Sequence, residues 1–274
     1  MKFDIRGCYD LHIHTSPDVI ARKVTDHELA VLASGAGMGG VMIKSHVFPT
    51  AGRAAALKNE FPDLKIFSGI ALNRTVGGIN PDAVEAAAKM GIQYVWLPTL
   101  DARRYMEENH KPCLEKGITV FDEDGKLRKE VGDVIDLVKK YDLTFGSGHI
   151  GTEDSLRLAE ICRDAGVRKY VLTHVSLPVC QADVSDLREA RAKGAYIEYS
   201  YTHVLSGKCS IPYIAGQIKE LGCDRIYLST DLGQAGNVDP VRGYSEFCGK
   251  LAEAGIPEED IYRMTKQIPK ELTD

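Results

Sequence analysis

The segment Tyr9-Asp10-Leu11-His12-Ile13-His14 predicts a β-strand, because β-branched, aromatic and apolar residues recur through it without a glycine or proline. A helix start follows at Thr25-Asp26-His27-Glu28, which has the spacing of a capping box and leads into a run rich in alanine and leucine. A strand followed by a helix is the repeating unit of parallel α/β sheets. The first part of the chain therefore predicts one βα unit.

Seven further runs of about five residues repeat this pattern. They are Val41–Lys44, Ile66–Ala71, Tyr94–Pro98, Thr144–Gly146, Tyr170–His174, Tyr196–Ser200 and Arg225–Ser229. Eight βα units in 274 residues match the size of a closed (β/α)8 barrel of the TIM type. We predict one such domain over residues 1–274, with a helical segment over Pro240–Asp274 that closes the barrel and a small hairpin at Asp122–Gly125.

An open doubly wound sheet is the alternative fold, with Gly35–Gly40 as a dinucleotide-binding loop. A phosphate-binding loop follows a strand and opens a helix, so that backbone N–H groups face the anion. The glycines of this chain follow a predicted helix and precede a predicted strand, which is the reverse order. They indicate a helix end and a tight turn instead.

Composition excludes several classes of protein. Hydrophobic residues make up 44% and charged residues 27% of the chain, which is ordinary for a globular protein. The net charge of −5 has no basic block, so we expect no nucleic-acid partner. The longest stretch without a charged side chain, Leu29–Ile43, is too short to span a membrane, and no apolar secretory signal is visible at the N-terminus. Seven scattered cysteines without a CxxC pair indicate reduced thiols, so we predict a cytoplasmic protein with no membrane partner.

The first predicted strand carries two candidate metal ligands, His12 and His14. Residues two apart on a strand point to the same side, here the inside of the barrel, which leaves Leu11 and Ile13 to face the helices. Neutral imidazole is the commonest protein ligand of zinc and related ions. The pair therefore predicts a metal site.

Three other predicted strands end in polar residues of the same kind: His149 after the fifth, His174 at the end of the sixth and Asp231 after the eighth. The carboxyl ends of barrel strands meet at one rim, where active sites are built. Histidines with one carboxylate form a metal site with an open position for water. Each residue alone could instead be a hydrogen-bonded core histidine or a helix cap, but the convergence of the set favours metal binding.

This set, in this order along the chain, resembles the amidohydrolase superfamily of metal-dependent (β/α)8 barrels. The runs Lys44-Ser45-His46, Leu72-Asn73 with Val76–Pro81, and Val95-Trp96-Leu97-Pro98-Thr99 are similar to an uncharacterised branch of amidohydrolase-like proteins without an assigned substrate. The resemblance covers nearly the whole chain. It implies the chemistry of the site but little about the substrate.

The resemblance implies that His12, His14 and His149 bind a divalent metal ion and that Asp231 is a further ligand and the proton shuttle. His174 would either bind a second ion or hold the attacking water and the developing oxyanion. Members with two ions usually bridge them by a carboxylated lysine or a glutamate after strand four, and Tyr94–Asp101 offers neither. We therefore expect one ion rather than two, with zinc first and manganese, iron or cobalt also compatible.

Three more residues are predicted to contact a substrate: Lys44, His46 and His203. Lys44 ends the second strand, and a lysine in the mouth of a barrel can have one of three roles. It could carry a carbamate that bridges metals, hold a substrate carboxylate or oxyanion with its ammonium, or extend its stem to solvent. His27 and His110 fall in predicted helices, where we expect them to face solvent.

These residues predict an enzyme, a hydrolase in which a metal-activated water attacks an amide, lactone or ester bond of a small, acidic substrate. A non-oxidative metal-dependent decarboxylase is an alternative that product analysis distinguishes. A phosphoesterase of the polymerase-and-histidinol-phosphatase type is another, because Asp10–Thr15 matches its first motif, but Asp231-Leu232-Gly233 lacks the late histidine that this class has. A metal-binding protein without turnover and a homo-oligomeric assembly both stay open.

Overall fold

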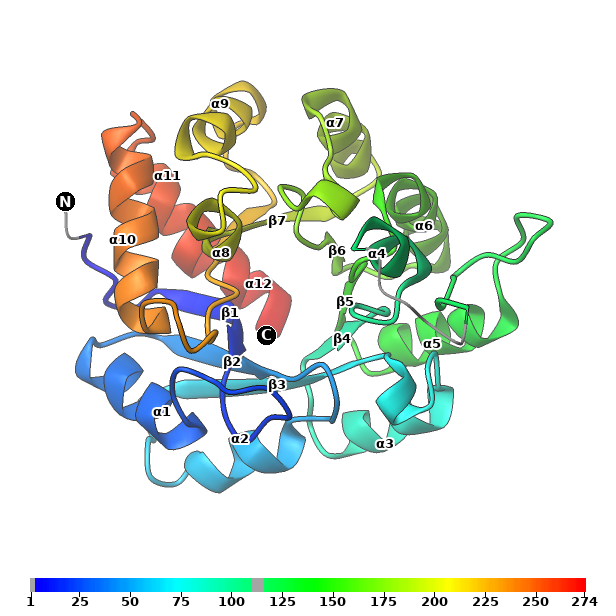
Figure 1. The fold of residues 1–274 in the computed structure, drawn as a ribbon, viewed down its shortest axis with the longest axis horizontal. Coiled ribbons are helices and arrows are strands. Elements are labelled where there is room, and N and C mark those ends of the chain that lie inside the picture. The colour runs from blue at the N-terminus through cyan, green and yellow to red at the C-terminus, as the bar shows by residue number, and fades with distance from the viewer. Residues whose placement is uncertain (1–2, 110–115) are drawn as a thin grey trace.

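The computed structural model describes residues 3–109 and 116–274. Within them, eight parallel strands form one sheet in the order β1 to β8, and helices cover its outside (Figure 1). The strands are β1 (Tyr9–His14), β2 (Gly40–Lys44), β3 (Lys65–Ala71), β4 (Tyr94–Trp96), β5 (Thr144–Gly146), β6 (Tyr170–Leu172), β7 (Tyr196–Ser200) and β8 (Ile226–Ser229). The predicted (β/α)8 barrel is confirmed, and all eight predicted strands are present.

The helices alternate with the strands, and extra short ones follow β4, β7 and α10. Their bounds are α1 (Asp26–Gly35), α2 (Ala51–Leu57), α3 (Pro81–Lys89), α4 (Arg103–Glu108), α5 (Lys129–Lys140), α6 (Thr152–Ala165), α7 (Val184–Ala192), α8 (Tyr201–Leu205), α9 (Ile211–Leu221), α10 (Pro240–Glu253), α11 (Glu258–Tyr262) and α12 (Ile268–Thr273). At α1 the predicted capping box is present, because Thr25 and Glu28 each accept the other's backbone N–H. No helix in the described ranges is long and apolar enough to cross a bilayer.

The local turns behave as the sequence indicates. Gly37 joins α1 to β2 with a φ of 68°, and a Cβ at Gly39 would lie 2.6 Å from the ring of Tyr9, so only glycine fits this αβ turn. The predicted hairpin is present as an antiparallel bridge between Phe121 and Leu127. The six described cysteines are free, as their spacing predicts, and Cys113 lies outside the described residues.

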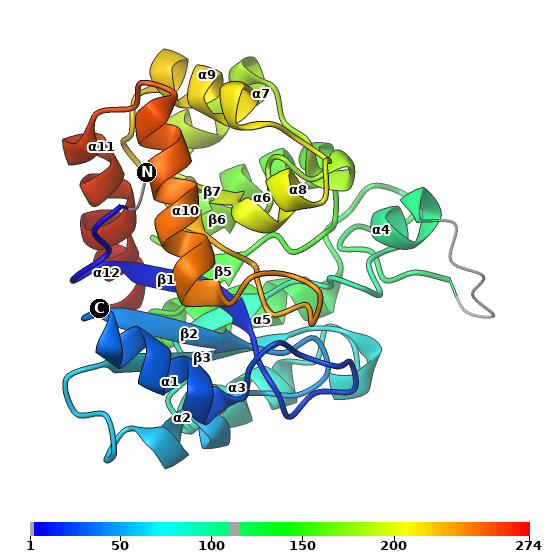
Figure 2. The same ribbon diagram turned by 60° about the vertical axis from the view of Figure 1, so that its left-hand side comes forward.

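The barrel closes through the residues that follow β8. The backbone N–H of Asp231 donates to the carbonyl of His12 at 2.8 Å, and that of His14 donates to the carbonyl of Leu232 at 2.8 Å. The hydroxyl of Tyr244 on α10 lies 2.7 Å from the carbonyl oxygen of Tyr9 on β1 and 2.9 Å from that of Leu228 on β8, so the C-terminal helices support the seam, as predicted. In Figure 2, α10 lies along the side of the barrel beside β1.

A second apolar cluster, separate from the layer between sheet and helices, fills the inside of the barrel. Its members are Tyr9, Leu11, Met42, Phe67, Ala71, Tyr94, Trp96, Val171, Tyr196, Tyr227, Ile268 and Leu272. The prediction that Leu11 faces the helices is therefore wrong, although Ile13 does belong to the outer layer. The cause is a shift of register between Asp10 and Ile13 in the pairing of β1 with β2, a β-bulge that breaks the two-residue alternation.

Candidate metal centre

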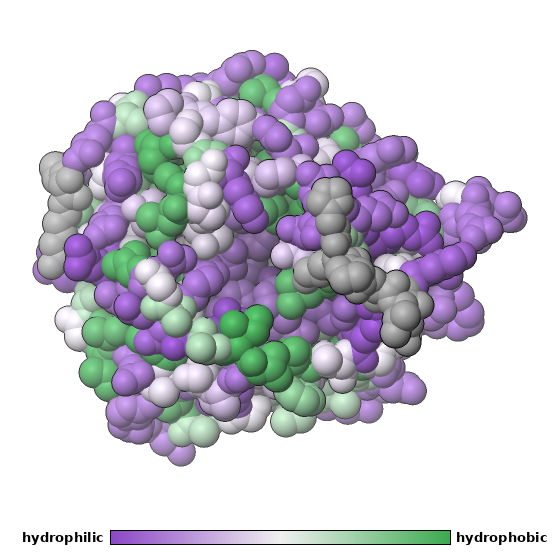
Figure 3. Space-filling model, viewed as in Figure 1, coloured by the Kyte–Doolittle hydropathy of each residue, from purple (hydrophilic) through white to green (hydrophobic). Residues whose placement is uncertain are grey.

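The predicted site residues meet in one cavity at the carboxyl ends of the strands. The cavity holds about 290 Å³ and is lined by Asp231 and five histidines, namely His14, His46, His149, His174 and His203. His12 and Lys44 lie buried beneath it. A hollow with hydrophilic walls is visible among the loops in Figure 3. Outside it, His27 on α1 is exposed, as predicted, and its Nε2 lies 2.8 Å from a carboxylate oxygen of Glu60. His110 lies outside the described residues.

Asp231 lies beside the two histidines of β1. One carboxylate oxygen, Oδ1, is 3.3 Å from Nε2 of His12 and 3.1 Å from Nε2 of His14. These three residues offer ligand atoms that all lie within 4.8 Å of one another. The seam between β1 and β8 creates this arrangement, because it pairs the backbone of Asp231 with that of His12.

The other oxygen of Asp231 faces a second pair of imidazoles. Oδ2 is 3.9 Å from Nε2 of His174 and 4.0 Å from Nε2 of His203, and these three residues also form a group within 4.8 Å. Both His174 and Asp231 adopt left-handed backbone conformations, with φ values of 59° and 50°. Such conformations are costly for residues other than glycine and are concentrated at functional sites.

His149 and His46 line the same cavity without joining either group. The ring of His149 is 5.4 Å from that of His174, and neither of its buried ring nitrogens has a hydrogen-bond partner among the described residues. His46 stacks on His14 at 4.6 Å, and its Nδ1 is 2.8 Å from the hydroxyl of Thr99. The role of His149 as a ligand and that of His46 as a substrate contact stay predictions.

Lys44 is fully buried, so the alternative that its stem extends to solvent is wrong. Its ammonium lies 2.7 Å from Nε2 of His12 and 4.8 Å from the centre of the Trp96 ring. Burial lowers the pKa of Lys44 to about 8, against the opposing pull of the Asp231 and Glu198 carboxylates. The two remaining alternatives, a carbamate or an ammonium that contacts substrate, are both compatible with this position.

Glu198 is the residue that sequence reasoning missed. It lies on β7, is fully buried, and its Oε1 is 2.6 Å from Nδ1 of His12 and accepts a hydrogen bond from Ser229 at 2.7 Å. Its Oε2 has no hydrogen-bond partner among the residues that the structure describes, and it lies 3.8 Å from Nδ1 of His174. Burial raises the pKa of Glu198. A signal was available, because a single carboxylate in the predicted strand Tyr196–Ser200 must be paired if that strand is buried.

Burial also controls the charge of the imidazoles. It is the largest cause of a lowered pKa at His12, His14, His46, His149, His174 and His203, and the last of these falls to about 4. Neighbouring Lys44 lowers the pKa of several of them further. These histidines are therefore neutral near pH 7, which is the form that binds metal.

The stability of the metal-free protein is expected to fall as the pH drops below about 6.5, the ordinary histidine pKa. Below that pH the unfolded chain binds protons that the folded protein, with its lowered pKa values, does not bind, so acid favours unfolding. Each such histidine contributes up to about 1.4 kcal/mol per pH unit. Urea unfolding after chelation, at pH values from 7.5 to about 5.5, measures the slope. A stability independent of pH would contradict the assignment.

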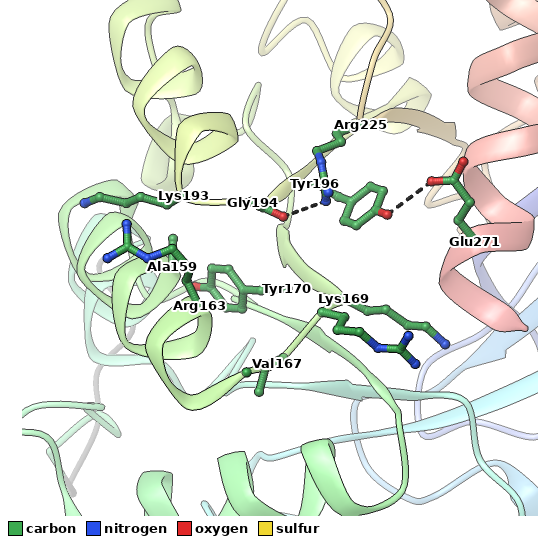
Figure 4. Close-up of a pocket in the computed structure, with 12 residues that line it drawn as sticks. Ala159, Arg163, Val167, Lys169, Tyr170, Lys193, Gly194, Tyr196, Arg225 and Glu271 are labelled. Carbon is green, nitrogen blue, oxygen red and sulfur yellow. Dashed lines mark hydrogen bonds between the residues drawn. The ribbon is translucent and has the colours of Figure 1, made fainter.

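A second cavity, of about 450 Å³, lies at the opposite end of the barrel, where β6, β7 and β8 begin (Figure 4). Its described lining includes five cationic side chains but neither histidine nor cysteine. Asp142 pairs with two of the cations, and Arg225 donates to the carbonyl of Gly194 at 2.8 Å, while Tyr196 donates to Glu271 at 3.1 Å. These contacts hold the base of the barrel together.

The fold is shared with several solved structures of low sequence identity. The TatD homolog YjjV from Escherichia coli K12 matches with a TM-score of 0.59 and 16% identity, covering 98% of each chain. The organophosphorus hydrolase from Deinococcus radiodurans matches with a TM-score of 0.63 and 13% identity, covering 99% of this chain and 93% of that one. An enamidase described as a member of the amidohydrolase superfamily matches with a TM-score of 0.58 and 14% identity, covering 98% of this chain and 67% of that one. The chain therefore has the barrel fold that the sequence resemblance implies.

A search of curated proteins finds no match to this chain. A sequence-family profile described as "Family of unknown function (DUF6282)" matches residues 7–198, which include β1 to β6 and most of β7. The matched part contains His12, His14, His149, His174 and Glu198, whereas Asp231 follows it in the chain. The chain belongs to the DUF6282 family.

Proposed function

We propose that the protein is a metal-dependent hydrolase that cleaves an amide, lactone or ester bond of a small, acidic substrate. The observation that carries this proposal is the arrangement of His12, His14 and Asp231, whose ligand atoms lie within 4.8 Å of one another in a cavity lined by further neutral imidazoles. The titles of similar structures support the reaction class, since they name an organophosphorus hydrolase, a dihydroorotase and a β-aspartyl dipeptidase.

The residues present fit a divalent metal ion. Both ring nitrogens of His149 and the Nδ1 atom of His14 are buried, and within residues 3–109 and 116–274 they have no hydrogen-bond partner. Such groups are costly unless something binds them. Neutral imidazoles with a carboxylate are the donor set that zinc prefers, although manganese, iron and cobalt accept the same ligands. We propose zinc, held by His12, His14 and Asp231, with His149 as a further ligand.

A divalent ion in this site would lower the pKa of a water molecule that it holds and polarise a substrate carbonyl. Asp231 is the carboxylate that lines this cavity, and in the proposed reaction it would accept a proton from water and pass it to the leaving group. If Nε2 of His12 held the metal, Lys44 would lose its hydrogen bond to that atom, and its ammonium would be able to contact a substrate carboxylate or an oxyanion. His174 retains two roles, as a donor to that oxyanion or as a ligand of a second ion.

Elemental analysis of the purified protein, followed by a screen of lactones, amides and esters with the metal found, tests the proposal. We expect bound metal in the wild type and in His27→Ala, a loss in His12→Ala, and hydrolysis that chelation abolishes and reloading restores. Release of carbon dioxide would favour the decarboxylase instead, and turnover of a chromogenic phosphate ester the phosphoesterase. Absence of metal under every loading condition would overturn the proposal.

A further inference from the structure

We infer that the cavity selects an amphipathic substrate. A ring-sized apolar group of this substrate lies against Leu100, Tyr105 and Leu177, and a negatively charged group at its far end contacts the ammonium of Lys208. The inference rests on the proposed function, because it names the substrate class of the same site. It identifies four specificity-determining residues that sequence reasoning missed, and it places the acidic group of the substrate at the mouth of the cavity, away from the buried Lys44.

The first support is the separation of apolar from polar residues around the cavity wall. The apolar residues come from the ends of β4 to β6, since Leu100 follows β4, Tyr105 lies on α4 and Leu177 follows β6. The polar residues other than histidine and aspartate come from the neighbouring ends of β7, β8 and β1, and they are Arg22, Thr202, Ser206, Lys208, Gln234 and Asn237. In Figure 1, α4 and α8 lie on different sides of the barrel axis. The wall therefore has an apolar half and a polar half.

The apolar half is a continuous surface beside the histidines. Leu177 belongs to a small buried apolar cluster, and Tyr105 packs against this cluster. The ring of Tyr105 also lies 4.7 Å from that of His149. Leu100 and Tyr105 stay partly exposed, so an apolar ligand that contacts them removes apolar surface from water. A planar ring suits this wall best, because aromatic side chains stack on other rings.

In the polar half, Lys208 is the cation whose charge is not compensated. Arg22 donates two hydrogen bonds to one oxygen of Asp18, at 2.9 and 2.8 Å, and both of these side chains are almost completely buried. Gln234 accepts a hydrogen bond from Asn237 at 2.9 Å. Within the described parts of the chain, Lys208 forms no ion pair. A negatively charged group of a ligand supplies the missing partner.

The turn that carries Lys208 is fixed beside the cavity. Its backbone N–H donates to the carbonyl of His203 at 2.9 Å, and Gly207 before it has a φ of 71°, which favours glycine. His203 lines the same cavity, and its role as a substrate contact stays a prediction. Burial lowers the pKa of His203 most, and the charge of Lys208 lowers it further. The ammonium is therefore close enough to act on groups inside the cavity.

The volume of the cavity limits the size of the substrate. Its 290 Å³ equals the space of about ten water molecules at about 30 Å³ each. One ring with two short polar substituents fits this space. Such a compound spans the two halves of the wall, with one substituent near the histidines and the other near Lys208.

Titration calorimetry on the purified, metal-loaded protein tests the polar half with compounds that need no turnover. Phenylacetate has a ring and one carboxylate, and para-carboxyphenylacetate has a second carboxylate at the far end of the ring. We expect the second compound to bind about 5-fold more tightly to the wild type, and the difference to shrink at about 1 M salt, which screens exposed charges. Lys208→Met should abolish the difference and Lys208→Arg should keep it. Lys65→Met is the matched control, because Lys65 is an exposed lysine at the other end of the barrel, where β3 begins.

A second pair of measurements tests the apolar half. Leu100→Ser replaces an apolar side chain of the wall by a small polar one, and circular dichroism confirms that the variant folds. It should weaken binding of both aromatic compounds by about 3–10-fold. Binding of glutarate, which has two carboxylates and no ring, should change by less than about 2-fold in the same variant.

Each half of the inference can fail separately from the proposed function. Equal affinities of the two aromatic compounds for the wild type, or an unchanged difference in Lys208→Met, would overturn the assignment of Lys208. An equal loss for glutarate and the aromatic compounds in Leu100→Ser would overturn the apolar half. Either result leaves the metal-dependent hydrolase intact. A protein that takes up no metal would instead overturn the proposed hydrolase, and the same differences measured without metal would still support the amphipathic wall.

Discussion

Asp231→Asn is expected to reduce hydrolysis by about 10³-fold or more and to lower the bound metal content. The amide cannot take a proton from water at neutral pH, and it is a weaker ligand than the carboxylate that lies 3.1 Å from His14 and 3.9 Å from His174. Because Asn has nearly the same shape as Asp, the barrel seam formed by the backbone of residue 231 should persist. Turnover and metal content of the same preparation, with circular dichroism to confirm folding, measure the effect.

Asp142→Asn is the matched control for this substitution. Asp142 lies at the opposite end of the barrel, where it is partly exposed and pairs with Arg168 and Lys169. Exposed ion pairs contribute about 0–1 kcal/mol, so stability should change little and turnover not at all. Full turnover and full metal content in Asp231→Asn would refute the role of Asp231 as ligand and proton shuttle.

Substitution of Glu198 is expected to weaken metal binding by about 10–100-fold. This holds although the Glu198 carboxylate and Asp231 lie on opposite sides of the His12 ring. The hydrogen bond of 2.6 Å from Nδ1 of His12 fixes the ring and makes Nε2 a better ligand. In Glu198→Gln an oxygen can still accept this hydrogen bond but carries no charge, so affinity should fall while the fold persists. Competition with a chromogenic chelator measures the affinity.

Glu198→Leu should have the larger effect, because it removes the partner of Nδ1 of His12 and leaves the hydroxyl of Ser229 with only its contact to Ser200. A buried group that loses its partner costs about 1–3 kcal/mol, which urea unfolding of the metal-free protein would detect. Glu271→Gln is the control, since Glu271 accepts from Tyr196 at the opposite end of the barrel. If Glu198→Gln retains more metal affinity than Glu198→Leu, then Glu198 positions His12 and does not merely fill space. Equal metal affinity in both variants and the wild type would exclude the positioning role.

The sequence predicted the barrel because its signals are local. Each of these signals can be recognised from a few consecutive residues. They include the capping box Thr25–Glu28, the glycine turn Gly35–Gly40 and the short strand-forming runs. Parallel strands then need helical crossovers, and the carboxyl ends of barrel strands always meet at one rim. For this reason His14, His149, His174 and Asp231 could be assigned to a single cavity without coordinates.

The sequence was less informative where the direction of a side chain depends on a one-residue shift in strand register or on a partner that is distant in the sequence. Leu11 faces the barrel interior because of a bulge that no local pattern reveals. Glu198 looked like part of an ordinary strand, since its partner His12 is far away in the sequence. The sequence placed His203 after a strand, but it did not reveal that His203 faces Oδ2 of Asp231.

The sequence by itself thus determined the order of the βα units and the kind of side chain at each strand end, because periodicity, capping and turn chemistry act between near neighbours in the chain. Only the tertiary structure decided which nitrogen of each histidine faces which carboxylate oxygen, that Lys44 is buried against His12, and that Glu198 supports the same ring from beneath. These outcomes depend on how the seam between β1 and β8 brings Asp231 to His12 and His14. The geometry across that seam is fixed by the packing of the whole barrel, which no single segment encodes.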